Sequence, residues 1–139
     1  MDVRDIASTD VVTAEIDDTV REVSIRMRDA GVGSVVVLDG RGEPIGIVTD
    51  RDLVVYVCDP DRDPDTTTAN DVMAREVVSV GPDASVLEAA AVMAEANVRR
   101  VPVLDADDLV GIVTLDDLLP AFVGGLADLA AVVEAESRR

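Results

Sequence analysis

Several residue types that carry common chemistry are absent or nearly absent from this sequence. It has no histidine, so it lacks both the commonest general base and the commonest nitrogen ligand for metal ions. It also contains no Walker-type glycine loop, no Cys-x-x-Cys pair and no serine flanked by glycines on both sides. The single cysteine, Cys58, excludes an internal disulfide, and its valine neighbours predict a buried structural thiol. We therefore expect a protein that is not an enzyme and that has no metal site.

Positive charge is scarce as well. Lysine is absent, and the 12 basic residues, all arginine, stand against 29 acidic ones, which gives a net charge of −17. Such a chain repels nucleic acid and anionic lipid, because both are bound through clustered positive charge. We therefore expect no nucleic-acid partner and no membrane partner. The acidic excess and the missing lysine resemble proteins of halophilic, salt-accumulating archaea, although an ordinary acidic protein remains the alternative.

Large apolar side chains are also few. Aromatic residues make up 1% of the chain and apolar residues 48%, so the core has to be built from valine, alanine, leucine and isoleucine. No run approaches the roughly 18 consecutive apolar residues that a membrane-spanning helix needs. The first residues lack the basic region followed by an apolar region that a secretory signal contains. On these grounds we expect a cytoplasmic protein.

What the sequence does contain is an internal repeat. Residues 46–53 and 111–118 both read Gly-Ile-Val-Thr-x-x-Asp-Leu, a buried-strand pattern followed by the start of a helix. Upstream positions match at a shift of 66 residues and these two stretches at a shift of 65. In the first copy the pattern predicts a strand at 11–13, a helix at 19–30, a hairpin of 34–38 with 44–49, and a second helix after residue 49.

Each Thr-x-x-Asp sequence admits two interpretations. The pairs are Thr49 with Asp52 and Thr114 with Asp117. The local interpretation is a capping box, in which both side chains bind free amides of the first helical turn. The same signature occurs at Thr19–Glu22 and Ser85–Glu88, where we assign no other role. Because a helix N-terminus attracts anions and polar groups, a ligand-binding role is the second interpretation.

A strand that ends in Thr-x-x-Asp, repeated in tandem in a chain of this size, resembles a pair of CBS domains (a Bateman module). The resemblance covers residues 3–122 and implies an α/β fold in which two tandem CBS repeats pack sheet to sheet with pseudo-two-fold symmetry. We divide the chain into CBS repeat 1 (1–58), an acidic linker (59–68), CBS repeat 2 (69–122) and a C-terminal helical tail (123–139).

In CBS pairs the threonine and aspartate of this turn contact the phosphate and ribose of an adenine nucleotide. The resemblance therefore implies a stand-alone regulatory module that binds an adenosine-containing ligand between the repeats. AMP, ADP or ATP are favoured and S-adenosylmethionine is a further candidate. Ligand binding would change the packing of the repeats, and an unknown regulated protein would sense that change.

The resemblance also implies a role for each site residue. Asp52 and Asp117 would accept hydrogen bonds from the ribose, since a carboxylate beside a phosphate would repel it. The phosphates would contact Thr49, Thr114, Arg99 and Arg100. The base would lie among Val12, Val35, Val78 and Val101, with polar contacts from Thr13, Ser34 and Ser79.

Arg99 and Arg100 stand at the start of a predicted strand in an otherwise acidic stretch. From the residues alone they are either a surface pair that meets nearby aspartates or a guanidinium fork for phosphate oxygens. The resemblance favours the fork. The first copy has Gly33 and Ser34 at the corresponding positions, so we expect the two sites to bind phosphate unequally.

Two alternatives stay open, a ligand-free interaction module and a divalent-cation sensor that uses the acidic surface. We also expect a homodimer, because the valine-rich helix faces offer apolar surface to bury. Beyond Phe122 the pair Gly124-Gly125 is expected to break the chain. A last helix with an apolar face (Leu126, Leu129, Val132, Val133) would then either fold back onto the domain or form a dimer contact.

Overall fold

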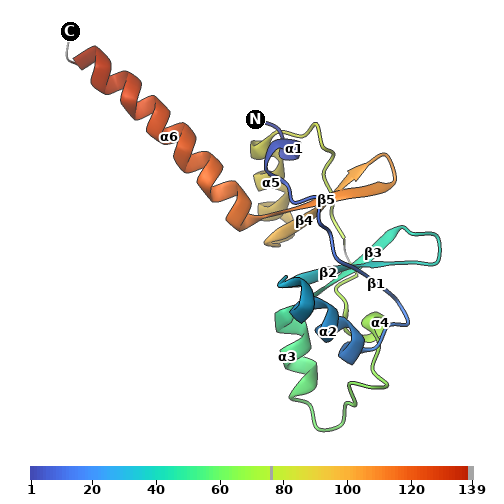
Figure 1. Ribbon diagram of the computed structural model, residues 1–139. Helices are drawn as coiled ribbons and strands as arrows, with labels where there is room; N and C mark the ends of the chain where they lie inside the picture. The colour runs from blue at the N-terminus through green and yellow to red at the C-terminus, as the bar shows by residue number, and fades with distance from the viewer. Residues whose placement is uncertain (76, 138–139) are drawn as a thin grey trace.

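The computed structural model describes residues 1–75 and 77–137, which form two α/β halves (Figure 1). The first half contains β1 (Thr13–Glu15), α2 (Val20–Ala30), β2 (Ser34–Leu38), β3 (Pro44–Thr49) and α3 (Asp50–Val57). The second contains α5 (Val86–Ala96), β4 (Arg100–Asp105), β5 (Asp108–Thr114) and α6 (Leu115–Ser137). Two helices of a single turn, α1 (Val3–Ile6) and α4 (Ala69–Val72), complete the elements. This arrangement confirms the predicted α/β fold of two repeats.

The two sheets differ in their number of strands. In the first half β1 pairs in parallel with β2, and β2 pairs antiparallel with β3. In the second half β4 and β5 form an antiparallel hairpin, and Val80 joins it only through an isolated parallel bridge to Val103. The hairpin of residues 34–38 with 44–49 matches the sequence prediction. The first strand does not, because it begins at Thr13 rather than at residue 11.

The long helices begin and end at equivalent residues of the two repeats. Thr19 and Ser85 are the N-caps of α2 and α5, and each accepts a hydrogen bond from the backbone N–H three residues later. Both helices end at a residue in the left-handed conformation, Gly31 (φ 67°) and Asn97 (φ 54°). Glycine and asparagine are the residues that tolerate this conformation best, so the repeat is encoded in the caps as well as in the strands.

Each half has its own core, and small aliphatic side chains fill both. The first core is centred on Val23, Val35, Val37 and Val48, and the second on Val101, Val103, Val113 and Leu118, none of them more than 2% exposed. Valine fits the pleated, half-buried surface of a strand because its branched Cβ has few rotamers to lose. The low aromatic content is therefore compatible with two closed cores.

The short helices α1 and α4 pack on the repeat that does not follow them in sequence. Val3 of α1 is fully buried in the second core, and its N–H donates to the carbonyl oxygen of Ala84 at 2.8 Å. Ala69 of α4 is fully buried in the first core, and its N–H donates to Asp18 O at 2.8 Å. Each short helix therefore precedes one repeat in the sequence but packs in the core of the other half, so the two halves exchange their first helices.

Gly46 and Gly111 permit this exchange at equivalent positions of β3 and β5. A Cβ at Gly111 would lie 2.9 Å from the carbonyl oxygen of Ser8, and one at Gly46 would lie 3.0 Å from that of Ala74. These close approaches allow Ser8 to form two backbone hydrogen bonds with Ile112 and allow the chain at Ala74 to pair with β3. The glycine that opens each Gly-Ile-Val-Thr sequence is thus a packing requirement.

The C-terminal helix contradicts the predicted break at Gly124-Gly125, and of the two alternatives for the last helix it excludes the one in which the helix folds back onto the domain. Helix α6 continues without a break through Pro120 and the Gly124-Gly125 pair, and it projects away from both halves instead of folding back (Figure 1). Its outer half is exposed along all sides. It is also long and apolar enough to cross a membrane by length and composition alone, with a mean hydropathy of 1.7. The apolar residues of this helix do not form one uninterrupted run, because Asp128 and the two glycines lie among them. The sequence pattern therefore did not indicate a helix of membrane-spanning length.

Helix α3 brings one more correction. Cys58, its C-cap residue, is exposed and not a buried thiol. The neighbouring Val55 and Val57 are also more than half exposed, because Leu53 is the side chain of α3 that enters the core. The sequence does not show which face of α3 is turned toward the core, so the burial of Cys58 that was predicted from its valine neighbours is wrong.

Candidate functional site

The first Thr-x-x-Asp turn joins β3 to α3. The N–H of Asp52 donates to Thr49 Oγ1 at 3.2 Å, and the N–H of Thr49 donates to Asp52 Oδ2 at 2.9 Å. This is a complete capping box at the N-terminus of an eight-residue helix. The second turn has the same design where β5 meets α6. Asp117 Oδ2 accepts from both the N–H and the hydroxyl of Thr114, at 2.9 and 3.0 Å.

Both boxes use only one oxygen of the aspartate. Within residues 1–75 and 77–137, the hydrogen bonds to Asp52 and Asp117 all end on Oδ2. Both carboxylates are partly buried. Each turn therefore keeps one acceptor oxygen, Oδ1, beside a helix N-terminus, where a hydroxyl donor of a ligand could reach it.

A cleft lies beside each turn, and each cleft is built from both repeats. The Thr114 cleft, about 420 Å³, joins the second turn to the start of β2; among the described residues it is lined by Ser8, Asp10, Val11, Val12, Val32, Gly33, Ser34, Asp50, Arg99, Arg100, Ile112, Thr114, Leu115, Asp116 and Asp117. The Thr49 cleft, about 320 Å³, joins the first turn to the start of β4; it is lined by Ile47, Thr49, Asp50, Arg51, Ala74, Val98, Arg99 and Arg100. Both volumes lie in the range of clefts that hold small ligands.

The structure brings several predicted site residues together. Val12, Ser34, Thr114 and Asp117 line the Thr114 cleft, and Thr49 lines the Thr49 cleft. Arg99 and Arg100 line both clefts and therefore lie between them. Asp52 is not in the described lining of the Thr49 cleft, but its carboxylate binds the N–H of the threonine that is.

Other predicted residues lie elsewhere. Val35 and Val101 are fully buried in the two cores, so they line neither cleft. Val78 packs against the second core, and Ser79 is exposed beside it. Thr13 lines a different hollow at the end of β1. Val35, Val101 and Thr13 each adjoin a cleft residue along the chain (Ser34, Arg100 and Val12), and periodicity alone did not indicate which of the two neighbours faces the cleft. Val78 and Ser79 lie outside the strands.

Sequence reasoning also missed residues that line the clefts. The apolar walls come from the pairs Val32/Val98 and Ile47/Ile112, which are equivalent at the repeat shifts of 66 and 65. Asp50 and Arg51 of the first turn, and Leu115 and Asp116 of the second, also line the clefts. Asp50, Arg51, Leu115 and Asp116 could have been identified from the sequence, because they occupy the two x positions of the Thr-x-x-Asp sequences.

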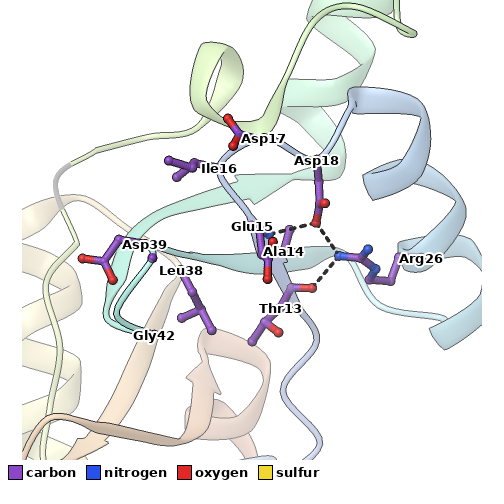
Figure 2. Close-up of a pocket in the computed structure, with 11 residues that line it drawn as sticks. Thr13, Ala14, Glu15, Ile16, Asp17, Asp18, Arg26, Leu38, Asp39 and Gly42 are labelled. Atoms are coloured by element: carbon purple, nitrogen blue, oxygen red, sulfur yellow. Dashed lines mark hydrogen bonds and ion pairs between the residues drawn. The ribbon is translucent and has the colours of Figure 1, made fainter.

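A larger hollow of about 1020 Å³ lies at the outer end of β1 and β2 (Figure 2). Figure 2 shows Asp18 directed at Arg26, whose guanidinium donates to Asp18 Oδ2 and to the carbonyl oxygen of Thr13, both at 2.9 Å. Burial alone would raise the pKa of Asp18, but hydrogen bonds from the Glu15 N–H and from Arg26 together lower it below its ordinary value. Arg26, the basic residue in the described lining, is engaged by Asp18 and Thr13, and the other charged lining residues (Glu15, Asp17, Asp39) are acidic, so we assign no ligand to this hollow despite its size.

The sequence of the chain matches the model of a known protein family. The model of the CBS domain matches residues 3–59 and again residues 69–124, which together cover most of the sequence. The chain belongs to the CBS-domain family. It carries a CBS pair, and such pairs are regulatory modules. The two matched stretches coincide with the two repeats inferred from the sequence.

Relatives of this CBS pair extend the comparison. An uncharacterized protein of Methanopyrus kandleri is 41% identical over 118 residues, which cover 84% of this chain and 60% of the relative. The uncharacterized protein YlbB of Bacillus subtilis is 41% identical over 117 residues, covering 84% of this chain and 78% of the relative. This chain thus spans less than two thirds of the Methanopyrus protein. Neither relative supports a halophilic archaeal origin.

A solved CBS domain pair has a similar fold. It was crystallised in complex with 5′-methylthioadenosine and S-adenosyl-L-methionine. The two chains superpose with a TM-score of 0.79 at 27% identity, and the match covers 90% of this chain and 98% of that one. The similar protein thus binds two adenosine compounds.

Proposed function

We propose that this CBS pair is a stand-alone regulatory module, without catalytic activity, that binds adenosine-containing ligands in its two inter-repeat clefts. The observation that carries the proposal is the composition of each cleft, which joins a Thr-x-x-Asp turn of one repeat to the first residues of a strand of the other. A ligand in such a cleft contacts both repeats at once. Its binding therefore depends on how the repeats are packed.

The chemistry of the lining fits the parts of a nucleotide. The aliphatic pairs Val32/Ile112 and Val98/Ile47 offer apolar walls for an adenine ring. The Oδ1 atom of Asp117 or Asp52 can accept a hydrogen bond from a ribose hydroxyl, while Oδ2 holds the capping box. Helix N-termini and arginine side chains suit phosphate oxygens.

Signalling follows from the same geometry. If a ligand prefers one packing of the two repeats, its binding shifts the population toward that packing, by at most its difference in affinity between the two states. A regulated protein that contacts both halves would sense the shift. The exchange of α1 and α4 between the halves couples them further, because a movement of one half displaces a core segment of the other.

Adenosine compounds are the favoured ligands because the similar CBS pair binds two of them, and AMP, ADP and ATP are proposed beside S-adenosylmethionine. The test is a thermal-shift and calorimetric screen of these compounds, with Mg²⁺ and Ca²⁺ alone as controls, in about 2 M KCl to screen the acidic surface. Saturable binding of an adenosine compound supports the proposal. Binding of the cations alone, or of nothing, overturns it in favour of a cation sensor or a ligand-free interaction module.

We further propose that two copies of the chain associate through α6 and that the protein works in the cytoplasm of a cell rich in salt. The support for association is the stripe of exposed apolar residues along α6, among them Leu119, Leu126, Leu129 and Val133, which are spaced by seven, three and four residues. This spacing is the pattern by which helices pair in coiled coils. The support for high salt is the net charge of −17.

A further inference from the structure

We infer that the two clefts select adenosine ligands that differ in charge. The Thr49 cleft takes a ligand with phosphate groups, whereas the Thr114 cleft takes an adenosine compound without phosphate, either neutral or cationic, such as a sulfonium. The inference rests on the proposed function, because it assigns a ligand class to each of the same two clefts.

The two clefts are built on a common plan. Val98, Ile47 and Thr49 of the Thr49 cleft correspond, at the repeat shifts, to Val32, Ile112 and Thr114 of the Thr114 cleft. Each cleft therefore has the same apolar walls and the same helix N-terminus. Both offer a comparable place for the adenosine part of a ligand, so any difference in selectivity has to come from the other lining residues.

The remaining equivalent positions differ in charge. Arg99 and Arg100 at the start of β4 replace a glycine and a serine at the start of β2. Inside the turns, Arg51 in the first corresponds to Asp116 in the second. Arg99 and Arg100 line both clefts, whereas Arg51 lines only the Thr49 cleft and Asp116 only the Thr114 cleft, so the pair Arg51/Asp116 is the difference that separates the two clefts.

The result is a difference in the sign of charge. The described lining of the Thr49 cleft has three arginines (Arg51, Arg99, Arg100) against one aspartate (Asp50). The described lining of the Thr114 cleft has four aspartates (Asp10, Asp50, Asp116, Asp117) against the two arginines that both clefts share. Counting Asp52, which caps the first turn, leaves the Thr49 cleft with an excess of arginine. In a chain of net charge −17, a cleft with excess positive charge is the place where an anion binds best.

Backbone hydrogen bonds fix the charged residues at these positions. The Asp50 N–H donates to the carbonyl oxygen of Gly33 at 3.0 Å, and the Leu115 N–H donates to that of Arg99 at 2.8 Å, so each turn is tied to a strand start of its own repeat. The Arg100 guanidinium then reaches across to the other repeat. A Cβ built on Gly33 would lie 3.6 Å from Arg100 Nη1 and 3.5 Å from Asp50 Oδ2. Arg100 and Asp50 therefore both lie within ordinary contact distance of residue 33, which has no side chain of its own.

The arginines of the Thr49 cleft are available to a ligand. Within residues 1–75 and 77–137, none of the ion pairs involves Arg51, Arg99 or Arg100. An arginine fork that is not already engaged can bind phosphate oxygens in a bidentate manner. In the Thr114 cleft the same phosphate would meet Asp116 and Asp117 at the helix N-terminus and be repelled, whereas a sulfonium would be attracted.

Calorimetric titration of the full chain with AMP, and separately with S-adenosylmethionine, tests the inference at the lowest KCl concentration that keeps the protein folded. We expect one site per chain for each compound and no competition between them. The charge-reversal variant Arg51→Asp should weaken AMP binding about tenfold and leave S-adenosylmethionine unchanged. Asp116→Arg should weaken S-adenosylmethionine about tenfold and open a second site for AMP.

Two exposed residues outside the clefts provide matched controls. Arg41→Asp in the first hairpin turn and Asp107→Arg in the second change the net charge by the same amounts and should alter neither affinity. Competition between the two compounds for the same sites, equal loss of both in Arg51→Asp, or equal effects of the control variants overturns this inference while the proposed function stands. If no adenosine compound binds the wild-type chain, both fall.

Discussion

At Asp52 and Asp117 one carboxylate group serves both the fold and the proposed ligand. Oδ2 of each closes a capping box, and Oδ1 points to no donor within the described residues. Folding therefore needs a hydrogen-bond acceptor at these positions, while ribose binding would benefit from its negative charge. Charge and acceptor can be separated by substitution, which allows the two roles to be measured independently.

The change of either aspartate to asparagine should separate them. Asparagine keeps an acceptor oxygen and is a good capping residue, so we expect the melting temperature of Asp52→Asn or Asp117→Asn to change little. Hydrogen bonds to a charged acceptor are about twice as strong as neutral ones, so affinity for an adenosine ligand should drop about tenfold, equal to about 1.4 kcal/mol. Thermal unfolding measures the melting temperature and calorimetric titration the affinity, both in about 2 M KCl to screen the charges. If these variants bind every ligand as the wild type does, the turns are helix caps only.

Gly111 gives a second prediction at a single residue. A methyl group there would lie 2.9 Å from the backbone oxygen of Ser8, which cannot move without breaking its hydrogen bonds to Ile112. We expect Gly111→Ala to lower the free energy of unfolding by about 1–3 kcal/mol, as overpacking does. Gly40→Ala is the matched control, because nothing lies within 4 Å of its added methyl group. Denaturation curves that shift equally for the two variants would contradict the close approach.

Among the elements, the hairpins and the helices α2 and α5 were predictable, whereas the short helices and the length of α6 were not. The pattern of β-branched residues around a glycine turn indicated β2 and β3, and the caps indicated α2. Helices α1 and α4 have four residues each, too few to show a helical period. Their exchange between the halves is a tertiary effect that depends on where two distant glycines allow backbones to meet. The resemblance to CBS pairs predicted a ligand between the repeats, but the sequence pattern did not indicate which residues of each strand line the clefts.

The length of α6 shows how local signals can mislead. The Gly124-Gly125 pair predicts a break in the helix. Each glycine, however, costs a helix only about 1 kcal/mol relative to alanine. The surrounding alanines and leucines favour the helix. Pro120 is the sixth residue of α6, past the first turn in which a proline is best tolerated, so the helix continues there without the hydrogen bond that an N–H of residue 120 would donate to the carbonyl oxygen of Asp116. Summed propensity over the whole segment would have been the better guide.

The exchange of α1 makes the first residues of the chain part of the second core. Val3 is fully buried among residues of the second repeat, so Val3→Ala should cost about 2 kcal/mol of unfolding free energy through lost burial and the cavity that remains. Exposed Val54→Ala on α3 is the control and should have little effect. Hydrogen exchange would locate the loss: amides of β4 and β5 should exchange faster in Val3→Ala, while those of β2 and β3 stay protected. Uniform loss across both sheets would contradict the assignment of α1 to the second core.

Helix α6 also gives a prediction about how the chain associates. If its apolar stripe pairs with that of a second copy, the protein should be a dimer by light scattering at about 100 μM in high salt, and the double variant Leu126→Glu, Leu129→Glu should be monomeric. Leu87→Glu on α5, also an exposed leucine, is the control and should leave the dimer intact. A wild-type monomer would contradict the proposal. If that monomer floated with phosphatidylcholine vesicles, α6 would be assigned to lipid instead.

In the whole molecule, the repulsion that accompanies a net charge of −17 opposes the stabilisation that two small cores supply. Protonation does not relieve the repulsion near neutral pH. At Asp39, for example, the backbone N–H groups of Glu43 and Arg41 lower the pKa of the carboxyl, so it stays ionised in the folded state. Screening by salt remains, and it is effective because the Debye length falls from about 10 Å at 0.1 M to about 3 Å at 1 M.

We therefore expect the folded state to be lost below a few hundred millimolar KCl, with a melting temperature that rises steadily as salt is added. Circular dichroism across a KCl series measures this. A parallel NaCl series should give the same midpoint ionic strength, since screening depends on ionic strength and not on the identity of the cation. A specific requirement for K⁺ would instead indicate a bound ion. A melting temperature unchanged between 0.1 and 3 M would show that attractions within the two valine cores exceed the repulsion among the carboxylates, and it would remove the argument for a salt-rich cytoplasm.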